Sequence, residues 1–521
     1  MHIHPSTFWA ILAALSLYTL VLLGLSYRAK RRSGESRYFD AGKKLSPTTV
    51  FLMVTALWTS STIAMEIDTG FADGWSAVWL GASTALLSIL VSWLAPRFMR
   101  LGYTTNSELL GRAYGPLVRR VTGVVIGATF PIFAMSNALF AGYFLHALLG
   151  WPLWFSLVAT TFLLLATVQF AGLDSLAAIQ GVNLVFILLA LGLLVVLVHG
   201  LPAHPLAVGH HPSPVANATI LVWLGTNLLN VFSAQAEFQA VVAAKNARRA
   251  QLAVLASSLF VGLVVFAATW VGRQARIDLG AVPGGGLSAV SHLVLTQASP
   301  LEAVLIAVGI WGLALTWCGP LLFSGAVSLG RDAISASVRW TKIALVGEAG
   351  LMISLALWRP DALAWWSVFG LTVRNAGVVG PTLALLLWGD RVPRWSVVGA
   401  IGAGIAAGVG LNAVTGFSAV HFLWGINPMW ISQTVSLVVL AFGRWWRSPH
   451  RSESALWLAI ALGLLMAEAS GNVLPVSLRG ITLLATSGLF FALTHLVLEH
   501  AKKASHANPS WQLLGDNVAS E

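Results

Sequence analysis

Polar and ionisable side chains occur at four places inside long apolar runs of the sequence, where a helix that faces lipid cannot carry them. They are Thr55, Thr59, Ser60, Ser61, Thr62, Glu66 and Asp68 within residues 51–74; Asn227, Asn230 and Glu237; Thr316, Trp317 and Cys318 just before Pro320; and Arg374 with Asn375. Such groups recognise a polar solute, a cation or a proton when helices gather them around one cavity. The sequence shows no nucleophile–base pair, metal cluster or phosphate loop, which argues against an enzyme.

The elements that must position these residues are membrane-spanning helices. Of the 521 residues, 57% are hydrophobic and only 9% are charged, whereas a soluble domain carries about 25% charged residues. Hydropathy predicts an all-α polytopic membrane protein with about fifteen spans of ~20 residues each. The predicted spans are 7–27, 49–72, 75–95, 121–149, 152–171, 177–199, 218–240, 250–272, 301–329, 341–358, 363–388, 396–415, 427–443, 454–470 and 477–498.

The basic residues indicate membrane orientation and not a nucleic-acid partner, although the net charge is +11. With the N-terminus outside, alternate loops become cytoplasmic and hold most of the 30 lysines and arginines, as at residues 28–32. The C-terminus is then cytoplasmic, and the expected location is the plasma membrane, such as a bacterial inner membrane. The single cysteine, Cys318, excludes an intrachain disulfide.

Two of the charges within the apolar runs have different interpretations. Glu237 is near the cytoplasmic end of its span, and we interpret it as an interfacial charge that pairs with Lys245 or Arg248. Arg374 is deep in its span, where an unpaired arginine costs ~3 kcal/mol or more. It therefore needs a carboxylate such as Glu66, a solvated cavity or an anionic ligand, so that structural pairing and ligand binding both remain open.

Several blocks of sequence, taken in order, resemble those of the sodium/solute symporter family. The blocks are RYFDAGKKL at 37–45, TALWTSSTIAMEIDTGFADG at 55–74, RFMRLGYTTNSELLGRAYG at 97–115, AGLDSLAAIQGVNLVF at 171–186, FQAVVAAKNARRAQ at 238–251, GRDAI at 330–334 and GPTLALLLWGDRVPRWSVVGA at 380–400. The number of spans between the blocks also resembles the family pattern. The resemblance extends over most of the chain, from residue 37 into the span 396–415.

This resemblance implies the leucine-transporter-like fold, in which two five-helix inverted repeats enclose a site near the membrane midplane. The implied parts are a first helix and loop (1–48), repeat one (49–199), an outer loop (200–217), repeat two (218–388), peripheral helices (389–498) and a cytoplasmic tail (499–521). The first core helix is expected to break near residues 57–61.

The resemblance also implies which residues form the site. The solute-facing positions are Thr62, Glu66, Asn227, Asn230, Val373 and Arg374, and the sodium positions are Thr55, Trp58, Thr316 and Trp317. The sequence departs from the family at Trp317, whose indole offers no lone pair, at Gln180 in place of an acidic residue, and at Ala240 in place of an arginine. Coupling to sodium, to protons or to no ion therefore stays open, with Glu66 or Asp68 as the proton carrier.

The predicted function is symport of a small polar organic solute across the plasma membrane, by default coupled to sodium. Arg374 favours a carboxylate or an amino acid over a neutral sugar. The alternatives are a proton-coupled or uncoupled carrier, and a solute sensor that does not transport and acts through a separate signalling partner. The expected partners are the solute and the lipid bilayer, with no nucleic acid and no cofactor other than possible Na⁺.

Overall fold

The computed structural model describes residues 4–31, 35–199, 215–280, 282, 284–360, 363–419 and 421–447, and most of them are helical. Every predicted span up to residue 443 coincides with a helix or with two consecutive helices. The predicted spans 454–470 and 477–498 and the predicted tail 499–521 lie outside the described residues, as does most of the predicted loop 200–217. Within the described part, ten segments are long and apolar enough to cross a membrane.

The helices follow the predicted spans closely, with short additional helices in the loops. They are α1 (Pro5–Lys30), α2 (Glu35–Asp40), α3 (Pro47–Asp73), α4 (Val78–Leu101), α5 (Asn106–Tyr114), α6 (Pro116–Leu149), α7 (Leu153–Ala171), α8 (Leu173–His199), α9 (Asn217–Leu229), α10 (Gln235–Val242), α11 (Ala247–Leu279), α12 (Gly285–Gln297), α13 (Pro300–Ala326), α14 (Val338–Trp358), α15 (Leu363–Trp388), α16 (Arg394–Val414) and α17 (Pro428–Arg447). A π-helical segment, η4 (Val327–Ile334), continues α13.

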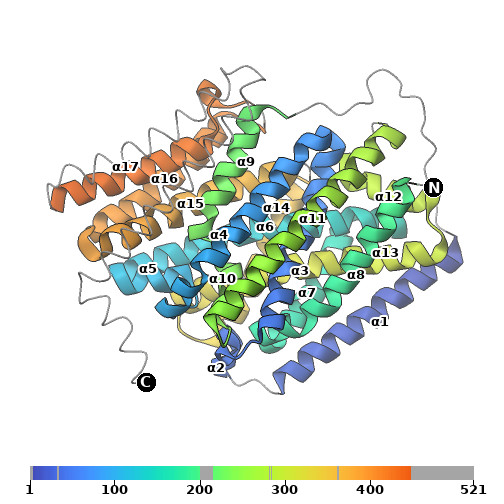
Figure 1. The fold of residues 1–521 in the computed structure, drawn as a ribbon, viewed down its shortest axis with the longest axis horizontal. Coiled ribbons are helices and arrows are strands. Elements are labelled where there is room, and N and C mark those ends of the chain that lie inside the picture. The colour runs from blue at the N-terminus through green and yellow to red at the C-terminus, as the bar shows by residue number, and fades with distance from the viewer. Residues whose placement is uncertain are drawn as a thin grey trace.

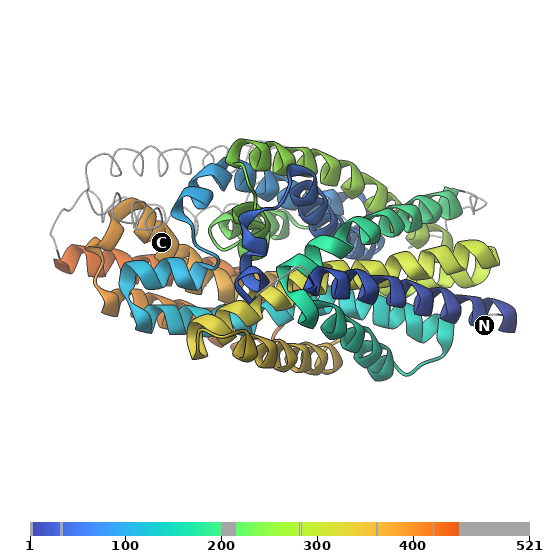
Figure 2. The ribbon, with the colours of Figure 1, turned by 90° about the horizontal axis from the view of Figure 1, so that it is seen from below.

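The helices that carry the predicted site residues form the centre of the molecule. α3 packs against α11, and α13 packs against α6 and α8. α1 and the pair α16–α17 lie at opposite ends of the long axis, as both ribbon views show (Figures 1 and 2). The inner helices are buried on most sides, whereas α1 and α16 expose most of their residues, so that the site helices are shielded from lipid.

The predicted span 218–240 is interrupted in its middle. α9 ends at Leu229, and α10 begins at Gln235, so that the two are separate helices in Figure 1. Asn230 and Ser233 promote the break because their side chains bond locally, with the Ser233 hydroxyl donating to Asn230 Oδ1 at 2.9 Å. The interruption leaves helix ends, with their unsatisfied backbone groups, in the middle of a membrane span.

Neighbouring helices satisfy the backbone groups that this break exposes. Asn375 of α15 donates to the carbonyl of Thr226 at 3.0 Å, and Asn106 of α5 donates to the carbonyl of Phe232 at 2.9 Å. A broken helix within a membrane is stable only where protein or water supplies such partners. Side chains from α15 and α5 therefore stabilise the break between α9 and α10.

The predicted break in the first core helix is wrong, because α3 is one continuous α-helix from Pro47 to Asp73. Residues 57–61 contain no glycine or proline, and the hydroxyls of Ser60 and Ser61 bond within the helix, as when Ser60 donates to the carbonyl of Leu57 at 2.8 Å. The backbone carbonyls of this turn therefore stay in the helical ladder, although the Ser60 carbonyl also accepts a bond from Asn137 at 3.0 Å.

Candidate functional site

A central cavity of about 30 Å³ lies among α3, α4, α6, α13, α15 and the break between α9 and α10. Its lining consists of Trp58, Ser61, Met65, Thr84, Phe133, Asn227, Asn230, Glu237, Trp317, Leu321, Ser367, Leu371 and Arg374. This volume holds about one water molecule. Asn227, Asn230 and Arg374, all predicted to face the solute, come together here, together with Trp58 and Trp317 from the predicted sodium set.

Arg374 of α15 is buried, with 4% of its surface exposed. Its guanidinium donates to Asn230 Oδ1 and lies against the rings of Phe130 and Phe133, 4.9 and 4.5 Å from their centroids. Each contact of this kind stabilises a cation without neutralising it. The predicted pairing with Glu66 does not form, since the structure gives Arg374 these other partners.

Glu237 is a lining residue that the sequence interpretation placed wrongly. It is buried, with 4% exposed, and lies on the cavity, whereas Lys245 and Arg248, its expected partners, are exposed to the surroundings. It occupies the first turn of α10, where the positive end of the helix dipole stabilises a carboxylate. The helix break brings Glu237 to the cavity, and the sequence signal for it is the run of polar residues from Asn230.

The cavity thus contains one potential anion and one potential cation that do not touch. Among the described residues, the structure records no salt bridge between Glu237 and Arg374. Asn227 forms another part of the cavity wall. Its side chain is held in place because its amide donates to the Ser83 hydroxyl at 2.8 Å. Aromatic rings supply much of the rest, with the Trp58 and Trp317 centroids 6.0 Å apart.

The other predicted solute-facing residues lie outside the cavity lining. Val373 is half-buried on α15 beside Arg374, and Thr62 is buried on α3. Glu66 lies between α3, α4 and α11, where its carboxylate accepts a hydrogen bond from Thr269 at 2.6 Å. The close approach of Gly81 to this carboxylate leaves no room for a side chain at position 81.

The predicted sodium residues offer few oxygens to an ion. The hydroxyls of Thr55 and Thr316 are buried and lack partners in the described part of the chain. Trp317 turns its indole N–H to the carbonyl of Phe133 at 2.8 Å, and Trp58 lies in the unbroken part of α3. Hard cations such as Na⁺ require about five or six oxygen ligands, by analogy with calcium and magnesium. These residues therefore do not fit a sodium ion as they are arranged.

Pro320 affects one backbone oxygen in this region, the carbonyl of Thr316. Proline has no N–H, so the carbonyl of Thr316, four residues earlier, loses its helical partner. The side chain of Gln180 takes this place and donates to the Thr316 carbonyl at 3.2 Å. The Gln180 amide thus occupies this carbonyl oxygen, which is then not free to meet a cation.

A second buried carboxylate lies away from the cavity, on α14. Glu348 is 2% exposed, and both of its oxygens lack hydrogen-bond partners among the described residues. Gly127 of α6 and Gly325 of α13 pack directly against it. Since this side chain is buried but does not line the cavity, it is a matched comparison for Glu237.

A larger cavity, here named the vestibule, lies above the central cavity at the Asp73 end of α3 and has a volume of about 550 Å³. Its lining includes Asp68, Asp73, Trp223, Trp365 and Val368. Residues one helical turn further along α9 and α15 line the central cavity, so the two spaces follow each other along the same helices. The vestibule is wide enough to admit a small solute.

The opposite end of the central helices is closed by five ionised side chains and two hydroxyls that bond to them, here named the ion-pair cluster: Glu108, Arg112, Arg119, Arg331 and Asp332, with Thr105 and Ser107. Asp332 accepts hydrogen bonds from Arg119 at 2.7 Å, from Arg331 at 3.0 Å and from Ser107 at 2.7 Å. Glu108 of α5 pairs with Arg331 and Arg112. Burial acts to raise the pKa of Glu108, but the Arg331 guanidinium and the other donors outweigh it and hold that pKa below its usual value.

Gln235, at the start of α10, connects the helix break to the closed end. It donates to the Ser324 carbonyl and to the hydroxyl of Ser328, each at 2.9 Å, and accepts from the backbone of Asn106 at 2.8 Å. This amide therefore joins α5, α10 and α13 directly below the cavity. A solute could leave at this end only after these contacts separate.

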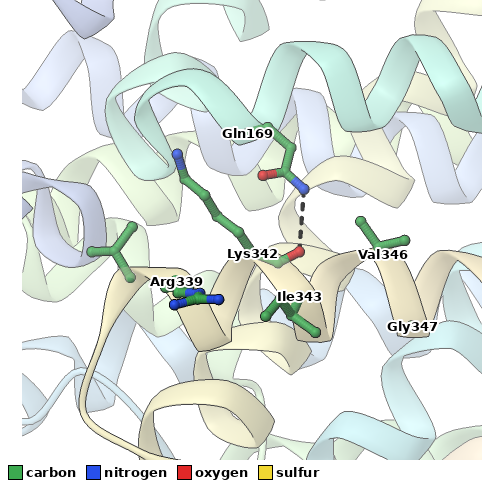
Figure 3. A pocket seen from close by; sticks show the side chains of 7 residues that line it. Gln169, Arg339, Lys342, Ile343, Val346 and Gly347 are labelled. Carbon is green, nitrogen blue, oxygen red and sulfur yellow. Dashed lines mark hydrogen bonds between the residues drawn. The ribbon is translucent and has the colours of Figure 1, made fainter.

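A groove of about 780 Å³ on the side of the molecule is larger than the central cavity but carries none of the predicted site residues. It runs between α7 and α14, where the Gln169 amide donates to the carbonyl of Lys342 at 3.2 Å and Arg339 and Lys342 supply positive charge (Figure 3). Its exposed Ile343 and Val346 are typical of a helix surface that faces lipid. We therefore assign the site to the central cavity.

No protein-family model matches the chain, and no curated protein matches it in sequence. Its fold is similar to that of a structure described as the substrate-bound outward-open state of a Na⁺-coupled sialic acid symporter, with a TM-score of 0.67, 15% identity, and coverage of 84% of this chain and 97% of that one. It is also similar to MhsT in complex with L-phenylalanine, with a TM-score of 0.50, 14% identity, and coverage of 76% and 98%. The chain therefore has the leucine-transporter-like fold of these transporters, as the sequence predicts.

Proposed function

We propose that the protein is a secondary active transporter that moves a small polar organic solute through the central cavity. The observation that carries this proposal is the pair of buried ionisable groups, Arg374 and Glu237, at a helix break in the middle of the membrane. Buried charges that form no direct salt bridge are costly in a membrane unless a ligand or water meets them. A solute that binds there would satisfy them and could leave by either end of the helices.

The two ends of the cavity support alternating access. The vestibule gives a route from one side, and the ion-pair cluster closes the other. In carriers of this fold, residues 49–199 and 218–388 correspond to two repeats that rock against each other around a fixed site. We propose that these ranges act in this way, with the vestibule facing the outside of the plasma membrane.

For the coupling ion, the structure favours a proton over the sodium that is the family default. The Thr55 and Thr316 hydroxyls are too few for Na⁺, whereas Glu66 is a buried carboxylate two residues along α3 from Asp68, which lines the vestibule. Uptake into proteoliposomes should then respond to a pH gradient in the absence of sodium. Uptake that requires sodium and does not depend on the pH gradient would contradict proton coupling and support sodium as the coupling ion.

The test of the proposed function is uptake of labelled carboxylates and amino acids by proteoliposomes containing Arg374→Ala. We expect a loss of about 100-fold or more, because the variant leaves the anionic part of the solute unpaired. Arg248→Ala, which removes an exposed arginine, is the control and should transport normally. Normal uptake by Arg374→Ala, with an unchanged gel-filtration profile, would assign Arg374 to structure alone.

A solute sensor is the second candidate, and the incomplete sodium set favours it, since a sensor needs no coupling ion. Such a protein would act through a separate partner. Counterflow separates the two, because a transporter exchanges internal for external solute and a sensor only binds it. Binding without exchange would replace the transporter assignment by the sensor.

A further inference from the structure

We propose that the solute is a zwitterion, with a carboxylate that binds Arg374 and an ammonium group, a few bonds away, that binds Glu237. This inference rests on the proposed function, because it concerns the solute of the same cavity. It goes further by requiring both charges on one molecule. The remaining walls, which include Met65, Leu321 and Leu371, fit an apolar remainder of the solute.

Arg374 has unused capacity to bind a carboxylate. A guanidinium carries five N–H donors, and the recorded hydrogen bond to Asn230 uses one of them. Its Nε is buried without a hydrogen-bond partner in the described chain. The rings of Phe130 and Phe133 hold the cation from the side and supply no acceptor oxygen. A carboxylate is the group that takes two such donors at once.

Glu237 has the complementary requirement. The first turn of α10 favours the carboxylate form, and the cavity is the open space beside it. The lysines and arginines nearest in sequence, such as Lys245 and Arg248, are exposed and are not part of the cavity lining. An ammonium group in the cavity would pair with this carboxylate and donate up to three hydrogen bonds.

The balance of charge decides between a zwitterion and a simple ion. Arg374 and Glu237 together are neutral, and a zwitterion keeps the cavity neutral while pairing both. A carboxylate without an amine would place its negative charge near Glu237. Like charges ~5 Å apart at an effective dielectric constant of ~20 reduce affinity by roughly 100-fold. An amine without a carboxylate meets the same penalty at Arg374.

The small volume of the cavity agrees with a site that opens to bind. A space of about 30 Å³ admits a water molecule between the two charges but no amino acid. The vestibule follows along the same helices, and Met65 and Leu371 are the cavity residues one turn from its lining on α3 and α15, so movement of their side chains would join the two spaces. Water would then be exchanged for the charged head of the solute, which reproduces its hydrogen bonds.

The test compares three matched sets of compounds: leucine and phenylalanine, their amine-free analogues 4-methylpentanoate and 3-phenylpropionate, and their carboxyl-free analogues isoamylamine and phenethylamine. Thermal shift measures binding to the purified full-length protein, and counterflow measures exchange. We expect the zwitterions to bind at least about 100-fold more tightly than either analogue. Glu237→Gln should reverse this preference toward the amine-free carboxylates.

The controls separate specificity from folding. Glu348→Gln removes a different buried carboxylate and should leave the preference unchanged. Glu237→Asp keeps the charge and should retain the zwitterion preference at reduced affinity, even if Glu237→Gln does not fold. Equal binding of amine-free carboxylates by the wild type, or no binding of any zwitterion, would overturn the inference. Zwitterion binding without exchange would leave it standing and overturn the transporter assignment.

Discussion

The two ends of the central cavity are built differently. At the Asp73 end, the vestibule is an open space of about 550 Å³. At the other end, Asp332 and Glu108 hold arginines from three different elements, and the Asp332 side chain is completely buried. One end is therefore an open space lined mostly by apolar and aromatic side chains, whereas the other is closed by ionised groups whose partners must separate.

This difference indicates which contacts set the balance between the two facing states. The ion-pair cluster joins α5 and α6, from residues 49–199, to η4, from residues 218–388. Rocking of one predicted repeat against the other must break these pairs, none of whose residues belongs to the vestibule lining. The cluster should then stabilise the state that opens to the vestibule.

The largest effect is expected from Asp332→Ala. This change leaves Arg119 without its recorded carboxylate partner and Arg331 with Glu108 alone, and removing one partner of a buried pair costs about 3 kcal/mol. Thermal unfolding of the purified protein in detergent measures the loss. Asp174→Ala is the control, because Asp174 is itself partly exposed and pairs with Arg37, which is about a third exposed, and such pairs contribute at most ~1 kcal/mol. Asp332, in contrast, has a completely buried side chain and also pairs with the largely buried Arg331. Equal losses in the two variants would remove the distinction between the cluster and an ordinary surface pair.

A smaller effect is expected from Asp332→Asn on the accessibility of the closed end to a thiol reagent. In a Cys318→Ala background, which removes the single native cysteine, Ala364→Cys in the vestibule should react quickly with a water-soluble thiol reagent. Ser328→Cys, buried below the cavity, should react slowly. Adding Asp332→Asn to Ser328→Cys should speed its labelling about tenfold, since a shift of ~1.4 kcal/mol changes a population tenfold.

Rapid labelling of Ser328→Cys with the ion-pair cluster intact would contradict the proposed difference between the two ends of the cavity. It would mean that the closed end opens without separating Asp332 from Arg119. Unchanged labelling after Asp332→Asn would instead show that the Gln235 contacts that remain in Ser328→Cys, with Ser324 and Asn106, close this end by themselves. Both results are read from the same reaction, with Ala364→Cys as the reference rate.

Hydropathy predicted the helices of the described region, because long apolar runs and their loop charges depend only on local composition. The fold, and the placing of Asn227, Asn230 and Arg374 at one site, followed from the family resemblance. The break in α3 was predicted from the resemblance alone, and the local chemistry of its hydroxyls prevails instead.

Glu237 shows what could not be predicted from the sequence. Counting along an unbroken span puts it near a membrane surface, and only the turn at residues 230–234 returns it to the cavity. The role of Gln180 was missed for a similar reason: its bond to Thr316 follows from the position of Pro320 on a different helix. Both features depend on how separate helices meet, which a single sequence does not encode in any short pattern.

The smallest effect is expected from pH at the closed end. Because the pKa of Glu108 is held below its usual value in the folded protein, its ion pairs contribute stability that is present above its unfolded pKa of about 4.3 and is lost as pH falls through the folded pKa. Glu108→Gln removes this titration, at a cost of about 1 kcal/mol near neutral pH. The difference in unfolding temperature between wild type and variant should therefore shrink as pH is lowered below 4.3. A constant difference would mean that Glu108 acts through its hydrogen bond to the backbone of Thr104 and not through its charge.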